Sequence, residues 1–524
     1  MSGASKIGGV IGSASASIMG CSNSGPVTAS TSYGAGVIGE ALAYSSLDSC
    51  KNSGVISAPQ YAAGVIAMSV AHTEENPLTI TACVNTADLE AGAKGYAGGL
   101  AGSLNNYVVF TDCHNSGNIS GATTGNGGLR LGGIISSTGK YTTFIRCYNT
   151  GDITAYSNSG GIAGYTGDKA TFEDCYNTGR ISGGATAATN VGGLVGSGPV
   201  FLTRCYNTGD VSGAGYQVGG LNGQNTTSQN PIVDCFNTGN VTGKNKVGGL
   251  IGMGRGLLNG CVNYGTVTAE NEASGIIGVP GNAAAASFVV RIENSLSLGA
   301  VVCKGATSAA VMAENTSCKF VEMENNYFDS SVVSATANDE KYGAAVKGLS
   351  ADKLAETAVS DAFRNEPACY PMLKSMAENG VYNFYSAFVQ LADGETPENV
   401  RSSFMVGQPG LVEWSASEGL VIDGSDVHYV GTETSGSEDV SGPRNADTKA
   451  WVKKSFGDLD KVYELMIDPV AMSVDDLEAD SDILEVSYFT LNGHRVVAPE
   501  PGQVIIRRAL HSNGIVHISK IIIR

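Results

Sequence analysis

The chain has 524 residues, of which 42% are hydrophobic and 15% are charged, so it is long enough to form more than one hydrophobic core. Its 31 Lys and Arg residues stand against 49 Asp and Glu residues, which gives a formal net charge of −18. The chain contains neither a basic stripe for a phosphate backbone nor an apolar run long enough to span a bilayer, so neither a nucleic-acid partner nor a transmembrane segment is expected.

The N-terminus, MSGASKIGGVIGSASASIMGC, has neither the charged n-region nor the uninterrupted apolar core of a signal peptide. Residues 8–12, followed by Cys21, already have the pattern of the second half of a repeat that recurs further along the chain. We therefore expect a leader sequence upstream of this chain, with or without further repeats.

A pattern of about 30 residues recurs through the first two thirds of the chain. An asparagine follows each repeat cysteine by two positions, and a glycine usually follows that asparagine by two more. About halfway to the next cysteine stands a Gly-Gly-apolar-apolar-Gly element, as at 192–196 and 248–252. The cysteines lie 26 to 34 residues apart, at positions 21, 50, 83, 113, 147, 175, 205, 235 and 261.

These repeats predict an all-β fold for residues 1–345. Short alternating apolar segments indicate strands, and glycines at fixed offsets indicate tight turns. One repeat cannot bury its own apolar face, but stacked repeats can. We therefore expect a parallel right-handed β-helix, a solenoid of about eleven rungs with one repeat per rung. At roughly 4.8 Å per rung its length is on the order of 50 Å.

Stacking places equivalent residues of successive rungs above one another, so structural ladders of cysteines and asparagines are expected. The asparagine amides have donors and acceptors to bond along the stack and to satisfy turn carbonyls. The thiols are expected to pack as small apolar groups, because no CxxC or His/Cys zinc spacing occurs; neither a metal site nor a cofactor is expected. The ladder positions are Cys147, Cys175, Cys205, Cys235, Asn149, Asn177, Asn207 and Asn237.

Charged residues alternate in sign from one repeat to the next. Stacked charges of opposite sign attract, and such pairs contribute about 0.2–1 kcal/mol each. This alternation accounts for the same carboxylates (Glu173, Asp174 and Asp210) that a β-helix polysaccharide lyase or hydrolase would need as acid and base. The alternating positions are Asp112, Arg146, Asp174, Arg204 and Asp234 before the cysteines, and Asp152, Arg180 and Asp210 after them.

Four aromatic residues follow consecutive cysteines: Tyr148, Tyr176, Tyr206 and Phe236. Stacking predicts that they form an exposed aromatic strip about four rungs long. Such a strip is a candidate binding site for sugar rings or for a protein partner. The alternative is that the stacked rings only stabilise adjacent rungs.

The repeat resembles the GLUG-type repeats of large bacterial surface proteins. The residues that carry the resemblance are CYNTG at 175–179 and 205–209 and VGGLVG at 191–196, and the likeness extends over residues 1–330. The segment NNYF at 325–328 resembles the closing element of such arrays. Many of these proteins are adhesin-like and some are associated with secreted peptidases, so the resemblance implies a location outside the cell.

The remaining sequence predicts further domains. Residues 346–385 read as a capping helix, at 350–363, with a linker, and 386–470 as an immunoglobulin-like β-sandwich that resembles bacterial domains around Trp414. An acidic linker follows at 471–483. Residues 484–524 form a small β domain similar to the C-terminal sorting domains of type IX secreted Bacteroidetes proteins; the alternative is an ordinary terminal hairpin.

Three functions remain open on the sequence. The favoured one is a non-catalytic, adhesin-like protein, secreted or on the outer-membrane surface, that binds a glycan or an extracellular protein. The second is a β-helix polysaccharide lyase or hydrolase, and the third is a structural spacer that displays another domain. The absence of a recognised catalytic motif around the six histidines is the reason for expecting a protein that is not an enzyme.

Overall fold

A computed structural model describes residues 1–375 except 93–94, 122–128, 156–157, 184–189, 227–229, 282–288, 306, 316–317, 331–332, 334–336 and 366–369. Beyond residue 375 it describes strands that lie between Glu413 and Ile522. The chain divides into two compact units, Met1–Ser350 with Ala358–Phe363 and Ala351–Thr357 with Arg364–Arg524.

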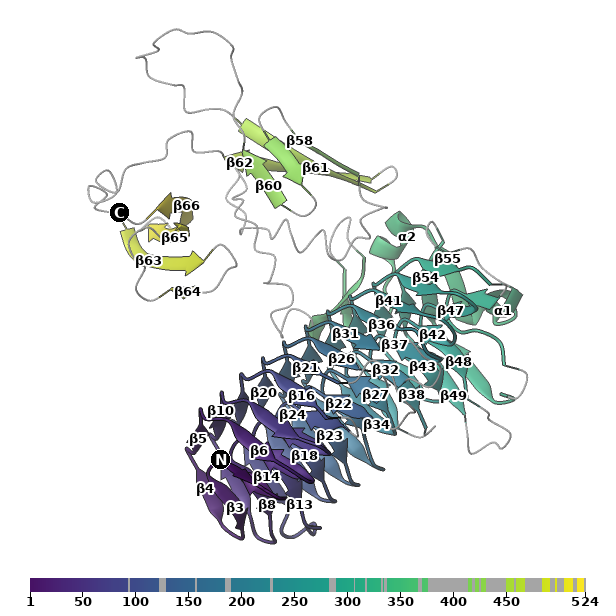
Figure 1. Cartoon of the computed structure of the whole chain (residues 1–524). Helices are drawn as coiled ribbons and strands as arrows, with labels where there is room; N and C mark the ends of the chain where they lie inside the picture. Colours follow the sequence, from purple (N-terminus) through teal and green to yellow (C-terminus); the bar gives the residue numbers. More distant parts are fainter. Residues whose placement is uncertain are drawn as a thin grey trace. The chain divides into compact units, whose positions relative to one another are not determined.

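The first unit is a parallel β-solenoid, which confirms the architecture that the repeat predicted (Figure 1). Each turn contains five short strands, and each strand pairs in parallel with its equivalent in the next turn. One such turn consists of β31 (Ile181–Gly183), β32 (Asn190–Gly192), β33 (Val195–Ser197), β34 (Val200–Thr203) and β35 (Tyr206–Asn207).

The equivalent strands form five long sheets, named A to E in the order in which a turn passes through them. Three of the sheets have eleven strands, sheet C has ten and sheet E has twelve, so the solenoid makes about ten turns, close to the expected eleven. Its handedness stays a prediction. The sheets run from β1 (Ser2–Gly3) to β51 (Val301–Cys303), from β2 (Ile7–Gly8) to β52 (Thr307–Ala309), from β3 (Ile11–Ala14) to β48 (Ile277–Pro280), from β4 (Ser17–Met19) to β53 (Val321–Glu324) and from β5 (Ser22–Asn23) to β55 (Val346–Leu349).

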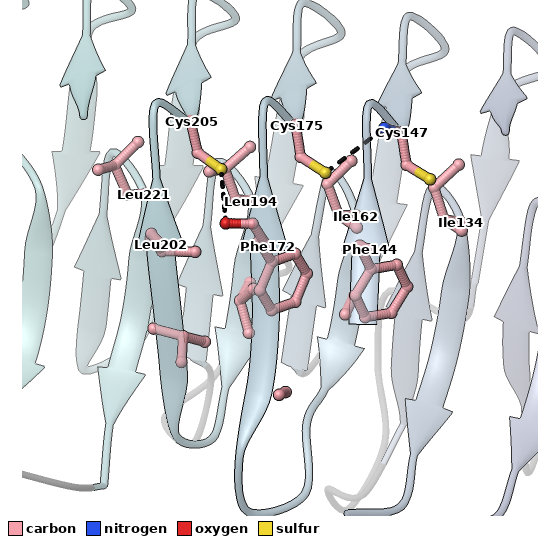
Figure 2. Packing of buried hydrophobic residues seen from close by; sticks show 14 of the residues in the cluster. Ile134, Phe144, Cys147, Ile162, Phe172, Cys175, Leu194, Leu202, Cys205 and Leu221 are labelled. Atoms are coloured by element: carbon pink, nitrogen blue, oxygen red, sulfur yellow. Dashed lines mark hydrogen bonds between the residues drawn. The ribbon is translucent and has the colours of Figure 1, made fainter. Parts of the chain in front are cut away.

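Two hydrophobic cores run along the solenoid. One lies between sheets A and B and contains Ile181 and Val191, whereas the other lies inside sheets C and D and the corner that leads to sheet E. Figure 2 shows part of the second core, where the rings of Phe144 and Phe172 stack with centroids 4.5 Å apart. The apolar residues of each Gly-Gly-apolar-apolar-Gly element enter this second core, because the two glycines turn the chain from sheet B into sheet C.

The residue before each repeat cysteine adopts the left-handed backbone conformation. The angle φ is 53° at Ser49, 54° at Asp112, 50° at Arg146 and 51° at Arg204. This conformation costs about 1–2 kcal/mol in a residue other than glycine. The inter-turn hydrogen bond is kept, however: Arg146 N donates to Glu173 O at 2.9 Å. The corner turns the chain from sheet D into sheet E once in every turn.

The C-terminal end of the solenoid is closed by the residues that follow the last turn. Strand β54 (Asn326–Asp329) and then β55 extend sheet E. The carboxylate of Asp339, in helix α1 (Ala337–Glu340), accepts hydrogen bonds from the backbone N–H groups of Ala310 at 3.0 Å and Val311 at 3.2 Å. In earlier turns the equivalent N–H groups donate to backbone carbonyls of the following turn. The Asp339 carboxylate therefore accepts the hydrogen bonds that one more strand would have accepted.

The capping helix expected at 350–363 is shorter in the structure. Residues 346–349 belong to strand β55, a short 3-10 helix η1 (Gly343–Ala345) precedes it, and α2 spans only Ala351–Glu356. The helix ends early because the Thr357 N–H bonds to the carbonyl of Leu354, three residues back, at 3.1 Å.

Beyond residue 375, the described residues of the second unit form three antiparallel sheets. Residues 386–412 and the acidic segment 473–482 lie outside the described residues, and both the immunoglobulin-like sandwich and the sorting domain stay predictions. No helix of the described residues is long and apolar enough to cross a membrane. The strands are β58 (Glu413–Ala416), β61 (Lys449–Phe456) and β62 (Leu459–Met466) in one sheet, β59 (Leu420–Asp423) with β60 (Asp426–Tyr429) in a second, and β64 (Arg495–Val496), β63 (Ile483–Thr490), β65 (Val504–His511) and β66 (Val516–Ile522) in a third.

Candidate functional site

The aromatic residues that follow the cysteines lie in register on the outer side of sheet E. Tyr148 pairs with Tyr176, Tyr176 with Tyr206 and Tyr206 with Phe236 in adjacent strands. Successive ring centroids are 4.7, 4.9 and 4.8 Å apart, and the ring planes differ by at most 5°. His114 extends the row at its N-terminal end, 4.7 Å from Tyr148. These five residues are called the sheet E row.

Only part of the sheet E row is accessible, so the prediction of an exposed strip is wrong for two of its four residues. Tyr206 is 2% exposed and Phe236 is fully buried, whereas Tyr148 and Tyr176 are half-buried. At the next two turns the equivalent positions are occupied by Val262 and Leu296, both fully buried. The C-terminal half of the row is therefore core, and the accessible half consists of His114, Tyr148 and Tyr176.

The stacking changes what this surface offers to a ligand. Because each ring lies parallel to its neighbours, the faces of Tyr148 and Tyr176 are covered by the rings above and below them. A ligand lying along the sheet meets ring edges and phenol hydroxyl groups instead. The edges carry the positive part of the ring quadrupole and the hydroxyls donate and accept hydrogen bonds. The surface therefore suits an oxygen-rich ligand better than a flat apolar ring.

Burial sets the protonation of this surface. Desolvation raises the pKa of Tyr176 to about 12, with a smaller contribution from the neighbouring Tyr148, whose own pKa is raised by burial. Burial, and secondly the charge of Lys51, lower the pKa of His114. At neutral pH the accessible half of the row is thus an uncharged array of two phenols and an imidazole.

The asparagine ladder lies inside the turns, beside the sheet E row. Asn149 Nδ2 donates to Asn177 Oδ1 at 2.7 Å, and Asn177 Nδ2 donates to Asn207 Oδ1 at 2.8 Å. Asn207 Nδ2 donates to Asn237 Oδ1 at 2.8 Å. Each amide also donates to the carbonyl two residues on, as Asn177 does to Gly179 at 2.7 Å. Both amide hydrogens are therefore used inside the protein, and the ladder is structural.

The cysteines are fully buried from Cys50 to Cys261 and none of them forms a disulfide. Figure 2 shows Cys147, Cys175 and Cys205 at the same corner of successive turns, and Cys205 Sγ donates to Phe172 O at 3.4 Å. Burial raises the pKa of the thiols of Cys175 and Cys235, which keeps them protonated. Within the described residues, no group of three or more His, Cys, Asp or Glu side chains is placed to hold a metal ion.

The carboxylates that resemble those of a polysaccharide lyase are already engaged. Arg204 donates to Asp174 at 2.7 Å and to Glu173 at 2.6 Å. Asp210 accepts a hydrogen bond from the backbone N–H of Asn240 at 2.9 Å. The contacts of Arg204 are inter-turn pairs of the kind that the alternating charges predicted, whereas the Asp210 contact is a hydrogen bond from the backbone of the next turn.

Comparison with known proteins identifies the repeat. The GLUG motif matches residues 155–182, which include Cys175 and Asn177. No curated protein matches the chain. One solved structure that it resembles is a putative immunoglobulin A1 protease from Bacteroides ovatus, at 17% identity and a TM-score of 0.28, over 60% of this chain and 87% of that one.

This comparison corrects one expectation. The prediction that the chain is not an enzyme is contradicted by the name of that similar structure, a putative immunoglobulin A1 protease. At this identity and TM-score the likeness assigns no residue to a reaction.

A second aromatic row escaped the sequence reasoning. Tyr33, Tyr61 and Tyr96 stack on the outer side of sheet B, with centroids 5.1 and 4.6 Å apart. Each tyrosine stands three positions before the second residue of the Gly-Gly pair, or of the Ala-Gly pair that replaces it. The sequence pattern that marks this row is therefore a fixed distance from that pair and not from the cysteine. It was missed because the position changes type along the chain, from tyrosine to Arg130 and then to amides.

Proposed function

We propose that the protein acts outside the cell, on a cell surface or as a secreted protein, and binds a glycan or an extracellular protein along the outer face of its solenoid. The GLUG repeat and the β-solenoid fit a surface protein. The immunoglobulin-like module and the sorting domain that the sequence predicts for the second unit are part of this proposal.

One observation carries the proposal: the half-buried phenols of Tyr148 and Tyr176 stand in register on consecutive turns of a rigid sheet. The stacking fixes both rings before a ligand arrives, so little side-chain entropy is lost when the hydroxyl groups form hydrogen bonds. A repetitive ligand with hydroxyl or carbonyl groups along its length can contact both phenols at once. Glycans and extended protein segments both have this property.

The test is retention of host glycans, plant glycans, matrix proteins and immunoglobulin A by the immobilised full chain, with products analysed in the same samples. In the double variant Tyr148→Phe/Tyr176→Phe the rings remain and the hydroxyls are lost, so retention of the bound ligand is expected to fall. The matched control is Tyr206→Phe, because that ring is buried and its replacement leaves the surface unchanged.

Retention that is equal in the double variant and in the control would overturn the role of the sheet E row. Retention of none of the ligands by the unmodified chain would overturn the binding proposal as a whole and leave the spacer hypothesis. Cleaved polysaccharide or protein in the samples would show an enzymatic activity in addition to binding.

A further inference from the structure

Sheets B and C meet at an inward corner along the solenoid. The last glycine of the Gly-Gly-apolar-apolar-Gly element lies directly against the backbone of sheet B in the preceding turn. A methyl group on Gly196 would stand 2.7 Å from Ser159 N, and one on Gly223 would stand 2.6 Å from Val191 N. No side chain fits there, so the outer faces of the two sheets approach closely, and the side chains on either side of the glycines form one continuous surface.

Two rows of side chains form this surface, called the B–C corner. Arg130 Nη1 joins the two rows within one turn, because it donates to Ser137 Oγ of sheet C at 2.8 Å. Within sheet C, Ser197 Oγ donates to Gln224 Oε1 of the next turn at 3.2 Å. Asn190 Nδ2 donates to Asn158 Oδ1 at 2.8 Å. In order along the solenoid, sheet B supplies Tyr33, Tyr61, Tyr96, Arg130, Asn158, Asn190 and Gln217, and sheet C supplies Glu40 (which is paired with Lys6), Met68, Ser103, Ser137, Tyr165, Ser197 and Gln224.

Arg130 differs from four other arginines of the solenoid. Arg146, Arg180, Arg204 and Arg291 each bond to a carboxylate of a neighbouring turn. Arg130 forms no ion pair with a described residue; its guanidinium lies 4.0 Å from the ring centroid of Tyr165 and uses one of its five N–H donors on Ser137. The undescribed loops between residues 93 and 189 contain no Asp or Glu.

From Tyr61 to Gln224, the side chains of the B–C corner are uncharged apart from Arg130, and all except Met68 are polar. Phenols, primary amides and serine hydroxyls donate and accept hydrogen bonds, as sugar hydroxyls do. A guanidinium with free N–H groups binds a carboxylate through two parallel hydrogen bonds. Parallel strands are spaced about 4.8 Å apart, which is close to the length of one sugar residue but not to the roughly 3.3 Å rise of an extended peptide.

We propose that the B–C corner binds a mainly neutral oligosaccharide that carries one acidic sugar, with the carboxylate of that sugar on Arg130. Tyr165 and Ser137 hold the guanidinium in position, and the phenols and amides of the adjacent turns contact the neutral sugars. This inference extends the proposed binding function to a second site, on sheets other than the sheet E row, and the two sites are tested with separate variants.

The test compares the binding of sialyllactose and of lactose to the full chain by calorimetry. The unmodified chain is expected to bind sialyllactose about tenfold or more tightly than lactose, because a charge-assisted hydrogen bond pair is lost with the acidic sugar. Arg130→Gln is expected to remove this difference, and Arg130→Lys to restore only part of it because lysine lacks the planar fork. Thermal unfolding establishes that each variant is folded.

Two control variants separate this site from other effects. Arg146→Gln removes a charge that is paired with Asp112, and Tyr148→Phe/Tyr176→Phe changes the sheet E row; both are expected to keep the preference for sialyllactose. Equal affinity of the unmodified chain for the two sugars, binding of neither, or an unchanged preference in Arg130→Gln would overturn the proposal. Loss of the preference in Tyr148→Phe/Tyr176→Phe with Arg130→Gln unaffected would also overturn it and assign the acidic sugar to the sheet E row.

Discussion

Asn177 is bonded to the turns on both sides of it: its Oδ1 accepts from Asn149 Nδ2 at 2.7 Å, and its Nδ2 donates to Asn207 Oδ1 at 2.8 Å. Its second amide hydrogen bonds to Gly179 O. The Asn177 side chain has no exposed surface. If its amide were removed, Asn149 Nδ2, Asn207 Oδ1 and Gly179 O would each lose this hydrogen bond with no water to replace it.

Replacing Asn177 with Leu is therefore expected to destabilise the solenoid by several kcal/mol, since each unsatisfied buried group costs about 1–3 kcal/mol. Denaturant unfolding of the full chain, followed by circular dichroism, measures this change. Thr178→Ala, at the neighbouring half-buried position, is the matched control and should change the unfolding free energy by less than about 1 kcal/mol. Equal effects of the two substitutions would contradict the importance of the ladder.

Gly161, the second glycine of its pair, is expected to tolerate no side chain. A methyl group there would overlap Asn177 Cγ and the carbonyl oxygen of Gly193 in the next turn. Gly161→Ala should therefore destabilise the protein by about 3 kcal/mol or more, because backbone atoms cannot move aside as side chains do. Gly12→Ala is the control, since its methyl group would have 3.8 Å of space. The melting temperature of Gly161→Ala should fall well below that of the unmodified chain, and that of Gly12→Ala should stay close to it. Equal melting temperatures of the two variants would contradict the prediction.

Asp339→Ala is expected to loosen the C-terminal end of the solenoid, because it removes both acceptors of the Ala310 and Val311 N–H groups. Hydrogen exchange measured by mass spectrometry should show faster exchange in residues 307–313, with the turns around Cys147 unchanged. Glu340→Ala, in the same helix, is the control. Protection in 307–313 that survives the loss of Asp339 would show that another group closes the last turn.

The ion pair between Asp112 and Arg146 should contribute a small, pH-dependent stabilisation. The hydrogen bond from Arg146 lowers the pKa of Asp112, so the stabilisation is fully present above the usual pKa of an aspartate and is lost as the pH falls through the lower folded value. Both side chains are about half exposed, so solvent screens the pair and the stabilisation is expected to be small. The stabilities of Asp112→Asn and the unmodified chain should therefore differ at pH 7, less so in high salt, and converge in acid.

The buried thiols should resist alkylation in the folded protein. Cys175 and Cys205 are fully buried, so the reagent has no access to either thiol, and burial also raises the pKa of Cys175 and keeps it protonated. Cys21 is partly exposed and should react. Mass spectrometry of the native and denatured chain after treatment with iodoacetamide measures both. Rapid native labelling of Cys175 would show that the corner opens, in conflict with its packing.

The repeat made the solenoid predictable from the sequence. Because equivalent residues of parallel stacked turns must lie above one another, the positions of Asn177 and Asn207 or of Asp174 and Arg204 predicted their contact before any coordinates were known. The division of each turn into five strands was not predictable in the same way, since it depends on where the Gly-Gly pairs and the left-handed corners bend the backbone.

Only the tertiary structure decided which of these ladders reach solvent. Tyr148 and Tyr206 occupy the same repeat position, yet the first is half-buried and the second is 2% exposed. The repeat fixes which face of the strand a residue takes, but it carries no information about what lies over that face. The surroundings of Arg130 depend in the same way on the approach of sheets B and C, which brings Ser137 and Tyr165 to its guanidinium. Periodicity determines register, whereas exposure depends on contacts between segments that the period does not relate.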